Sequence, residues 1–493
     1  MVAPVLRQIW TVTPTILAHF SGGVILSYPS CLIPGLKAVD SSIKVDVSTA
    51  SWLASSVAIG MVIGIIQSTY ILNKLGRKIA HMLAVVPAIV GWTLIYFAAD
   101  VTWLIVGRIL GGLSTSATFI VACCVISEYT APEIRGLIFS LKTTSFVFAS
   151  LLVHILGMLF HWRTIALISN MPLLVSLAIN FTWVESPAWL ALKGSTKKSE
   201  ETFYWLRGAS NRSVKEFEAM IQAQDKRKQN TIQPISLKDK IIYFYVICTK
   251  KDFLKPMMVC ICMLGCLETS GRHIFPAFST IIMAEILPKN MDASVYIISF
   301  DIIALVGNSI SSMLIKILNR RTMTFLSGIL SFVALCTFSL YGYLIHAGLV
   351  TSKPWVLVTI LISYLTVSNI GISSLPLVIK GEVFPLYIRE TGLALASICT
   401  SISAFIILKT TLILFTNITV FGTFAVLAII LLSCLVYLYY NLPETRNKTM
   451  QEIEDYFIYG SFVDRNIKIE NAVDTEVTIT SNNASEQDKL VKH

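Results

Sequence analysis

The chain has 493 residues, of which 55% are hydrophobic and only 14% are charged. Soluble domains average about 25% charged residues, and a single soluble core stops growing near about 250–300 residues. Here apolar stretches recur from Val12 to Asn441, each near the roughly 20 residues that a helix needs to cross a bilayer. The composition therefore excludes soluble, secreted, fibrous and disordered proteins. It predicts an all-α polytopic membrane protein.

The charges and cysteines narrow the class further. The formal net charge of +10 fits the excess of Lys and Arg that membrane proteins carry on their cytosolic side, so we expect no nucleic-acid partner. Nine of the ten cysteines lie in apolar stretches, and the sequence predicts neither disulfides nor a metal site. We expect no cleavable signal, because the first apolar stretch is longer than the core of a signal peptide.

Windows of about 20 residues predict twelve transmembrane helices. In chain order these spans are 12–33, 50–72, 79–98, 101–126, 137–160, 164–184, 256–286, 294–315, 322–346, 355–381, 391–416 and 418–441. One long polar insertion separates the first six from the last six. We therefore expect an N-terminal six-helix bundle (1–184), a cytosolic linker with short helices (185–255), a C-terminal six-helix bundle (256–441) and a cytosolic tail (442–493).

The orientation follows from the positively charged loops. With Met1 in the cytosol, the short inner segments carry nine Lys and Arg residues and the short outer loops carry five. The long basic insertion lies on the same inner side. Because positive loops are retained in the cytosol, we expect both termini to be cytosolic.

Three charged features recur in the same order six spans apart, which indicates a duplicated unit. A Glu followed seven residues later by an Arg comes after spans four and ten, a pair of basic residues after spans two and eight, and a Glu after spans six and twelve. The residues are Glu128 and Arg135, Glu382 and Arg389, Arg77 and Lys78, Arg320 and Arg321, and Glu185 and Glu444. An even number of spans keeps both units in the same orientation, as in the parallel repeat of major facilitator transporters.

These features belong to six motif segments that occur in a fixed order. They are Gly107-Arg108-Ile109-Leu110-Gly111-Gly112, Ser127-Glu128 through Arg135-Gly136, Glu185-Ser186-Pro187-Ala188-Trp189-Leu190, Glu382-Val383-Phe384-Pro385, Pro443-Glu444-Thr445 through Thr449, and Glu452-Ile453-Glu454-Asp455-Tyr456-Phe457. With them the chain resembles the sugar porter branch of the major facilitator superfamily over essentially its whole length. Thr143-Thr144, the short first outer loop and the tail look most like the insect facilitated trehalose transporter group. The resemblance implies the major facilitator fold of two six-helix bundles, a small sugar as partner and no cofactor.

The motifs on the inner surface make physical sense as a gate. A carboxylate and a guanidinium that bracket a turn can each pair with a matching motif nearby, and bidentate Arg–carboxylate pairs are strong and directional. Asn73 and Lys316 stand where the resemblance implies acids, so we expect a weaker latch than in a typical member. The alternative is that these are loop charges that satisfy the positive-inside rule and the helix ends. We expect one network that holds the two bundles together on the cytosolic side, formed by Arg77, Arg108, Glu128, Arg135, Glu185, Arg320, Arg321, Glu382, Arg389 and Glu444.

The resemblance places the sugar site near the bilayer midplane between the bundles. Most positions at which the family contacts a hexose through Gln or Asn carry other residues here, and the Trp of span ten is replaced by Leu377. The expected substrate contacts come from spans five, seven, eight, ten and eleven. They are Thr143, Leu267, Glu268, Arg272, His273, Ala304, Asn369 and Thr400.

Span seven carries ionisable groups, which are rare inside a membrane and cost about 2.5–3.5 kcal/mol each at a helix centre. Glu268 and Arg272 are four residues apart on one helical face, so they could pair with each other structurally or face the substrate. His273 is either a substrate contact or a spectator. Asp301 in span eight faces the same cavity or pairs with a Lys or Arg, for example Arg272.

The first span contains no carboxylate, whereas the proton-coupled sugar porters that it resembles carry an Asp there. A proton relay needs a titratable group, so we expect facilitated diffusion of trehalose or a hexose by alternating access. Glu268, Asp301 and His19 leave coupling by another route open. We expect no enzyme activity and a plasma-membrane location. One alternative is a sugar sensor or non-transporting relative; another is a transporter of a charged or non-sugar solute. The oligomeric state is not predicted.

Overall fold

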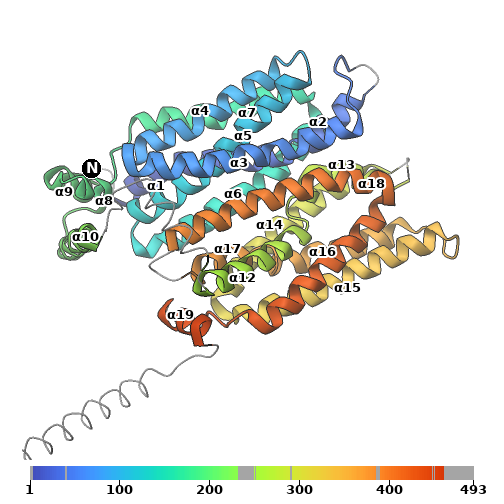
Figure 1. Ribbon diagram of the computed structural model, residues 1–493. Coiled ribbons are helices and arrows are strands. Elements are labelled where there is room, and N and C mark those ends of the chain that lie inside the picture. The colour runs from blue at the N-terminus through green and yellow to red at the C-terminus, as the bar shows by residue number, and fades with distance from the viewer. Residues whose placement is uncertain are drawn as a thin grey trace, which may run out of the picture.

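The computed structural model describes residues 4–38, 41–230, 249, 251–288, 291–384, 389–446, 448 and 450–459. Every regular element within these ranges is a helix. Figure 1 shows long helices running side by side in two groups, with the first half of the chain (blue to green) above the second half (yellow-green to red).

The first half consists of long helices joined by short turns. They are α1 (Pro4–Ser27), α2 (Pro29–Lys37), α3 (Val47–Leu75), α4 (Arg77–Tyr96), α5 (Val101–Tyr129), α6 (Pro132–Leu159) and α7 (Trp162–Phe181). The predicted first span is therefore two helices. Pro29, which has no N–H to donate and suits the first position of a helix, begins α2.

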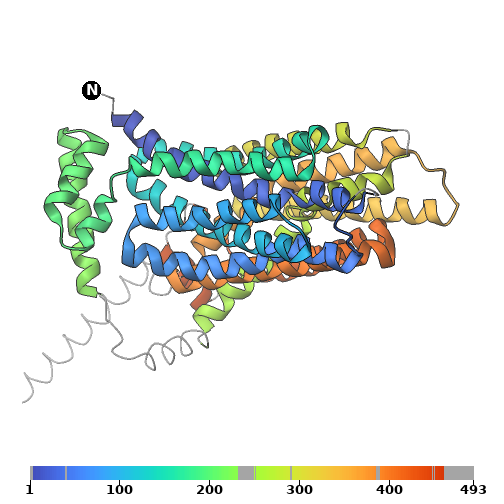
Figure 2. The same cartoon turned by 90° about the horizontal axis from the view of Figure 1, so that it is seen from above.

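Three further helices follow α7 and gather at one end of the molecule, beside the start of α1, as Figure 2 shows from above. They are α8 (Pro187–Leu192), α9 (Thr196–Arg207) and α10 (Asn211–Asn230). Gln8 Nε2 donates to the carbonyl of Leu206 at 3.1 Å, which holds α9 against α1. We call this end of the molecule, where α8–α10 lie, the linker end.

The second half repeats the arrangement of the first. Its helices are α12 (Lys251–Thr269), α13 (Ile274–Ile286), α14 (Ala293–Ile317), α15 (Arg320–His346), α16 (Pro354–Ile370), α17 (Leu375–Glu382), α18 (Arg389–Asn441) and α19 (Met450–Tyr459). Spans seven and ten, predicted as single helices, are each interrupted, between α12 and α13 and between α16 and α17.

The number of membrane-crossing segments agrees with the fold predicted from the sequence. In the described part of the chain, eleven helical segments are long and apolar enough to cross a membrane when α1–α2, α12–α13 and α16–α17 are each counted once. The last of these, within α18, covers two predicted spans. The backbone leaves the helical conformation at Ile418 and Thr419, which separates one span from the other. The predicted all-α architecture with many membrane-crossing helices is thus confirmed for the described residues, whereas the four domain limits stay a prediction.

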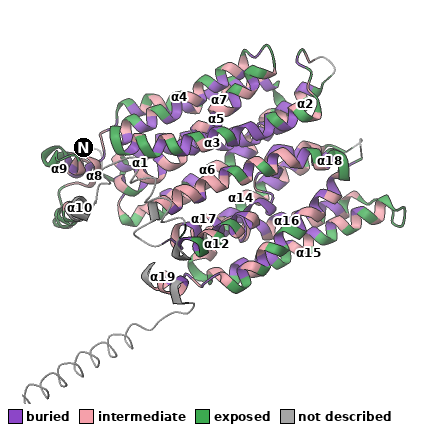
Figure 3. Ribbon diagram, in the orientation of Figure 1, coloured by how far each residue is buried: buried purple, intermediate pink, exposed green. Residues whose placement is uncertain are grey.

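The helices pack closely inside and expose apolar side chains outside. A Cβ added at Gly112 of α5 would lie 1.8 Å from the carbonyl oxygen of Val57 on α3, so the crossing of these helices requires glycine, as is common between membrane helices. Large apolar residues such as Ile66, Phe181 and Leu340 are exposed, and Figure 3 shows exposed stretches along the outward faces of the bundle. An apolar exterior of this kind suits a lipid environment.

Candidate functional site

Two cavities lie between the halves of the molecule. The first is lined by residues of α1, α6, α13, α14 and α16 together with the turn between α12 and α13. The second adds residues of α3, α5, α17 and α18. Sites for small molecules commonly lie between the helices of a bundle. Both cavities are therefore candidates for the solute site.

The cavities follow one another along the long axis of the bundle. On α6, which starts at the linker end, Thr143 lines the second cavity, Phe146 lines both, and Ser150 and His154 line the first. The second cavity is therefore nearer the linker end, and we call it the inner cavity; the first is the outer cavity. Leu26, Phe146 and Arg272 line both and form the boundary between them.

The structure brings seven of the eight predicted substrate contacts to these cavities. The inner cavity is lined by Thr143, Leu267, Arg272, His273 and Thr400. The outer cavity is lined by Arg272, Ala304 and Asn369. Glu268 is the exception, since it is buried and lines neither cavity. The substrate-binding role of all eight residues stays a prediction.

The interruption between α12 and α13 determines which side chains of span seven meet the cavities. Gly271 has a φ of +79°, and a Cβ there would lie 2.5 Å from Cδ2 of Phe275. This left-handed conformation favours glycine, and it ends the regular helix before Arg272. Tyr364 of α16 donates a hydrogen bond to the carbonyl of Thr269, which fixes the end of α12.

The broken helix explains why Glu268 does not pair with Arg272. An i,i+4 pair needs a continuous helix between its members, and here the backbone turns away after Thr269. Glu268 instead accepts hydrogen bonds from Nδ1 of His273 at 2.7 Å and from the hydroxyl of Ser403 on α18 at 3.0 Å. Arg272 is left at the cavity boundary, with its guanidinium 5.7 Å from the ring centre of Phe146.

A second ionisable pair joins the two halves across the outer cavity. His154 of α6 donates through Nδ1 to Asp301 of α14 at 2.5 Å, and Ser150 donates to the same carboxylate at 3.1 Å. Ser279 of α13 lies 3.2 Å from Nε2 of His154. The sequence had suggested Lys or Arg as partner for Asp301, so the histidine is a correction. We call His154 and Asp301 the outer pair.

Other contacts between the halves lie at the same end as the outer pair. Thr280 of α13 donates to the carbonyl of Ser30 on α2 at 3.1 Å. Ser51 near the start of α3 donates to the carbonyl of Lys409 on α18 at 2.8 Å. These two hydrogen bonds and those of the outer pair all join the first half of the chain to the second at this end. The halves are thus held together opposite the linker end.

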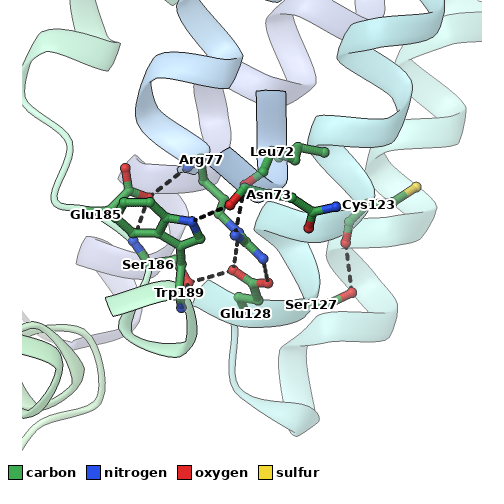
Figure 4. A network of polar contacts seen from close by, with 9 residues as sticks. All are labelled: Leu72, Asn73, Arg77, Cys123, Ser127, Glu128, Glu185, Ser186 and Trp189. Atoms are coloured by element: carbon green, nitrogen blue, oxygen red, sulfur yellow. Dashed lines mark hydrogen bonds and ion pairs between the residues drawn. The ribbon is translucent and has the colours of Figure 1, made fainter. Parts of the chain in front are cut away.

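The charged motif of the first half forms a compact cluster at the linker end (Figure 4). Arg77 makes a bidentate contact with Glu128, with N–O distances of 2.5 and 2.7 Å. Glu185 accepts from the backbone N–H of Arg77 at 2.8 Å, where the first N–H groups of α4 have no partner within the helix. Ser186 also donates to Glu128. These contacts tie α4, α5 and the start of α8 together.

The second half contains the same cluster. Arg320 pairs with Glu382 at 2.9 Å, and Glu444 accepts from the backbone N–H groups of Arg320 and Arg321 at 3.1 and 3.0 Å. Thr445 takes the place of Ser186 and donates to Glu382 at 2.6 Å. The duplication predicted from the sequence is therefore present in the contacts themselves.

In this arrangement Glu128, Glu382 and Glu444 contact residues of their own halves, and one network across the halves stays a prediction. Arg108 lies away from both clusters and donates to backbone carbonyls of Leu53 and Ile25. Arg135 donates to the carbonyl of Thr130 at 3.2 Å, and Arg321 to that of Tyr439 at 2.7 Å. The side chain of Arg389 falls outside the described residues. The weaker latch expected from Asn73 and Lys316 stays a prediction.

Three functional candidates escaped the sequence analysis. They are His154, Lys142 and Lys380, the last of which lines the inner cavity. Lys142 and Lys380 are buried, with 2% and 9% of their surface exposed. Charged residues within predicted spans mark function by default, so this signal was present in the sequence. The partner of His154 could not be found without the packing of α6 against α14.

Comparisons with known proteins agree on one family and one fold. The family described as "Sugar (and other) transporter" matches residues 20–457. The facilitated trehalose transporter Tret1 of Apis mellifera ligustica is 24% identical over 417 residues, which cover 85% of this chain and 81% of that protein. The human facilitated glucose transporter member 6 of solute carrier family 2 is 26% identical over 479 residues, with 90% of each chain covered. The inward-open structure of the E. coli xylose transporter XylE matches with a TM-score of 0.72 at 16% identity, over 92% of this chain and 99% of that one.

Proposed function

This chain belongs to the sugar transporter family, and we propose that it carries trehalose or a hexose by facilitated diffusion. The observation that carries the proposal is the pair of cavities enclosed between two repeated halves. Members of the family are transporters rather than enzymes, so the protein has to bind and release its solute without covalent chemistry. Relatives named as trehalose and glucose transporters support this choice of sugars.

The side chains of the cavities have the chemistry that a sugar requires. A sugar is a ring of hydroxyl groups with apolar faces, so its site needs polar partners beside an aromatic wall. Asn369 and Ser150 of the outer cavity, and Thr143 of the inner one, offer amide and hydroxyl groups. Phe146 lines both cavities and supplies an apolar surface.

The asymmetry of the contacts supports alternating access. Hydrogen bonds join the halves opposite the linker end, whereas at the linker end a groove opens between α3 and α18, lined by Thr69, Asn73 and Ile398 among others. Transporters of this type move a solute by opening its central site to one side at a time. Ile65 of α3 lines both this groove and the inner cavity, so the inner cavity lies beside the groove. We propose that the linker end and both termini are cytosolic and that the protein lies in the plasma membrane.

Flux measurements on the purified chain in proteoliposomes test the proposal. Labelled trehalose and glucose should enter down their gradients, and an imposed proton gradient should leave the initial rates unchanged. Proton-dependent accumulation against a gradient would contradict facilitated diffusion. Because Glu268 and Asp301 each contact a histidine, such a result would direct attention to these pairs.

A further inference from the structure

Three positively charged side chains stand beside the inner cavity without a carboxylate partner. Arg272 and Lys380 line it, and Lys142 lies behind one of its walls, 3.9 Å from the ring centre of Phe119. Nζ of Lys380 donates only to Ser397, at 3.2 Å, and Nζ of Lys142 only to the sulfur of Cys123, at 3.1 Å. Within the described chain, the Arg272 guanidinium has no hydrogen-bond acceptor and none of the three cations has an ion-pair partner.

The buried acids nearby compensate these cations only in part. Glu268 attracts Arg272 electrostatically, but its carboxylate accepts hydrogen bonds from His273 and Ser403 and lines neither cavity. Asp301 accepts from His154 and Ser150 and lines only the outer cavity. A buried charge is costly unless it is paired and hydrogen-bonded. The inner cavity therefore presents more positive than negative charge to whatever enters it.

Aromatic rings of the first half connect two of the cations with the inner cavity. Phe119 and Phe146 both line the inner cavity, and His19 lies against them with ring centres 5.6 and 5.0 Å apart. Lys142 sits over Phe119 and Arg272 over Phe146. Such cation–π contacts offset only part of the cost of burying a charge. The wall thus combines an apolar face, suited to a sugar ring, with cations at its edges.

We propose that the transported solute is a sugar that bears an anionic group, a carboxylate or a phosphate, which binds Arg272 and Lys380 in the inner cavity. The inference rests on the proposed transport function and specifies its substrate class. The planar guanidinium of Arg272 can hold either group through two parallel hydrogen bonds. Lys380 lies on α17, the part of span ten that follows the interruption, and adds a second positive charge closer to the linker end.

A matched pair of sugars tests the substrate class. D-Glucose and D-glucuronate share one ring, and the second carries a carboxylate in place of the CH2OH group. With the full chain in proteoliposomes, the transport efficiency for glucuronate should exceed that for glucose at least tenfold. Glucose 6-phosphate as a third solute distinguishes a phosphate from a carboxylate preference. Glucuronate that crosses alone moves one negative charge across the membrane. A membrane potential of about 100 mV should therefore change its accumulation at equilibrium about 50-fold and should leave the accumulation of glucose unchanged.

Variants connect the preference to the two cations. Arg272→Gln and Lys380→Gln should each lower the ratio of glucuronate to glucose transport at least tenfold, and Arg272→Lys should retain more of it than Arg272→Gln. The control is Lys353→Gln, which removes a charge from the exposed turn before α16 and should keep the wild-type ratio. Should a variant fold poorly, thermal unfolding of the wild-type protein supplies a second measurement: glucuronate should raise the unfolding temperature more than glucose at the same concentration.

Two outcomes separate this inference from the proposed function. If glucose or trehalose enters while glucuronate and glucose 6-phosphate neither enter nor compete, the anionic substrate is wrong and sugar transport stands. In that case Lys142 and Lys380 serve only as inner-side charges of the kind that orient membrane helices. If none of the four solutes enters, the transport function itself is wrong, and the inference falls with it.

Discussion

Replacing Asp301 by Ala should release the outer end of the bundle. The change removes the carboxylate that accepts from His154 and Ser150, in a pair whose side chains are only 3% and 11% exposed. Hydrogen bonds to charged groups contribute about 1.5–3 kcal/mol, and water would hydrate the separated groups in the outward-open state. A net loss of about 2 kcal/mol corresponds to a roughly 30-fold shift of the equilibrium toward that state.

Distance measurements between the halves detect this shift. Spin labels at Lys37, which ends α2, and at Met291, ahead of α14, would report the separation at the outer end, after the native cysteines have been replaced. We expect one population of short distances in the parent protein. In the Asp301→Ala variant a second population at longer distance should appear, since the state with the outer pair intact loses its advantage.

Asp292→Ala supplies the matched control. This acid also lies at the outer end, but it accepts from the backbone N–H of Ser294 at 2.9 Å and so caps its own helix, α14. Its replacement should leave the distances between the halves unchanged. An unchanged distribution in a folded Asp301→Ala protein would refute the reasoning, because it would show that the outer pair does not hold the halves together.

Three further predictions concern the charge clusters, the interrupted span and Glu268. Arg77→Gln and Arg320→Gln should each lower the free energy of unfolding by about 1.5–3 kcal/mol. In the double variant the two losses should add within about 0.5 kcal/mol. A larger coupling energy, measured by thermal or denaturant unfolding, would instead support one shared network. Gly271→Ala should lower the maximal transport rate several-fold, because a side chain in this left-handed position costs about 1–2 kcal/mol and meets Phe275. A wild-type rate, with equal amounts of reconstituted protein, would contradict this account of the turn. Glu268→Ala leaves His273 and Ser403 without their acceptor and should lower the unfolding temperature. The control Thr400→Ala removes a hydroxyl that donates to the carbonyl of Ala396 in its own helix, so it should change the unfolding temperature much less. Equal effects would show that Glu268 is not structural.

The features that repeat were the ones that sequence reasoning predicted well. Glu128 and Glu382 occupy equivalent places in the two halves, and the structure pairs each with the Arg that begins the corresponding helix, Arg77 or Arg320. Their spacing reveals the duplication, because equal segments fold alike. It does not reveal the partners of each charge, so the two separate clusters of this arrangement could not be predicted from the spacing.

The hydrophobicity of 20-residue windows could not predict that the helices of spans seven and ten are interrupted. The window of span seven remains apolar on average although Glu268, Arg272 and His273 lie near Gly271, and the positive φ of Gly271 shows that the helix stops there. The pairing of Glu268 with Arg272, one of two alternatives that the sequence left open, requires a continuous helix, and the structure does not form it. Contacts between distant segments, such as His154 with Asp301, depend on packing and carry no local signal.

The most direct test of the account is side-specific labelling of a cysteine at Thr143, which lines the inner cavity, in a background without other cysteines. Membrane vesicles of both orientations would be treated with a maleimide that cannot cross the bilayer. Alternating access predicts labelling from the linker-end face and, more slowly, from the opposite face, with the slower rate increased by Asp301→Ala. Labelling from one face only, in both the parent and the Asp301→Ala protein, would contradict a cavity that opens to each side in turn.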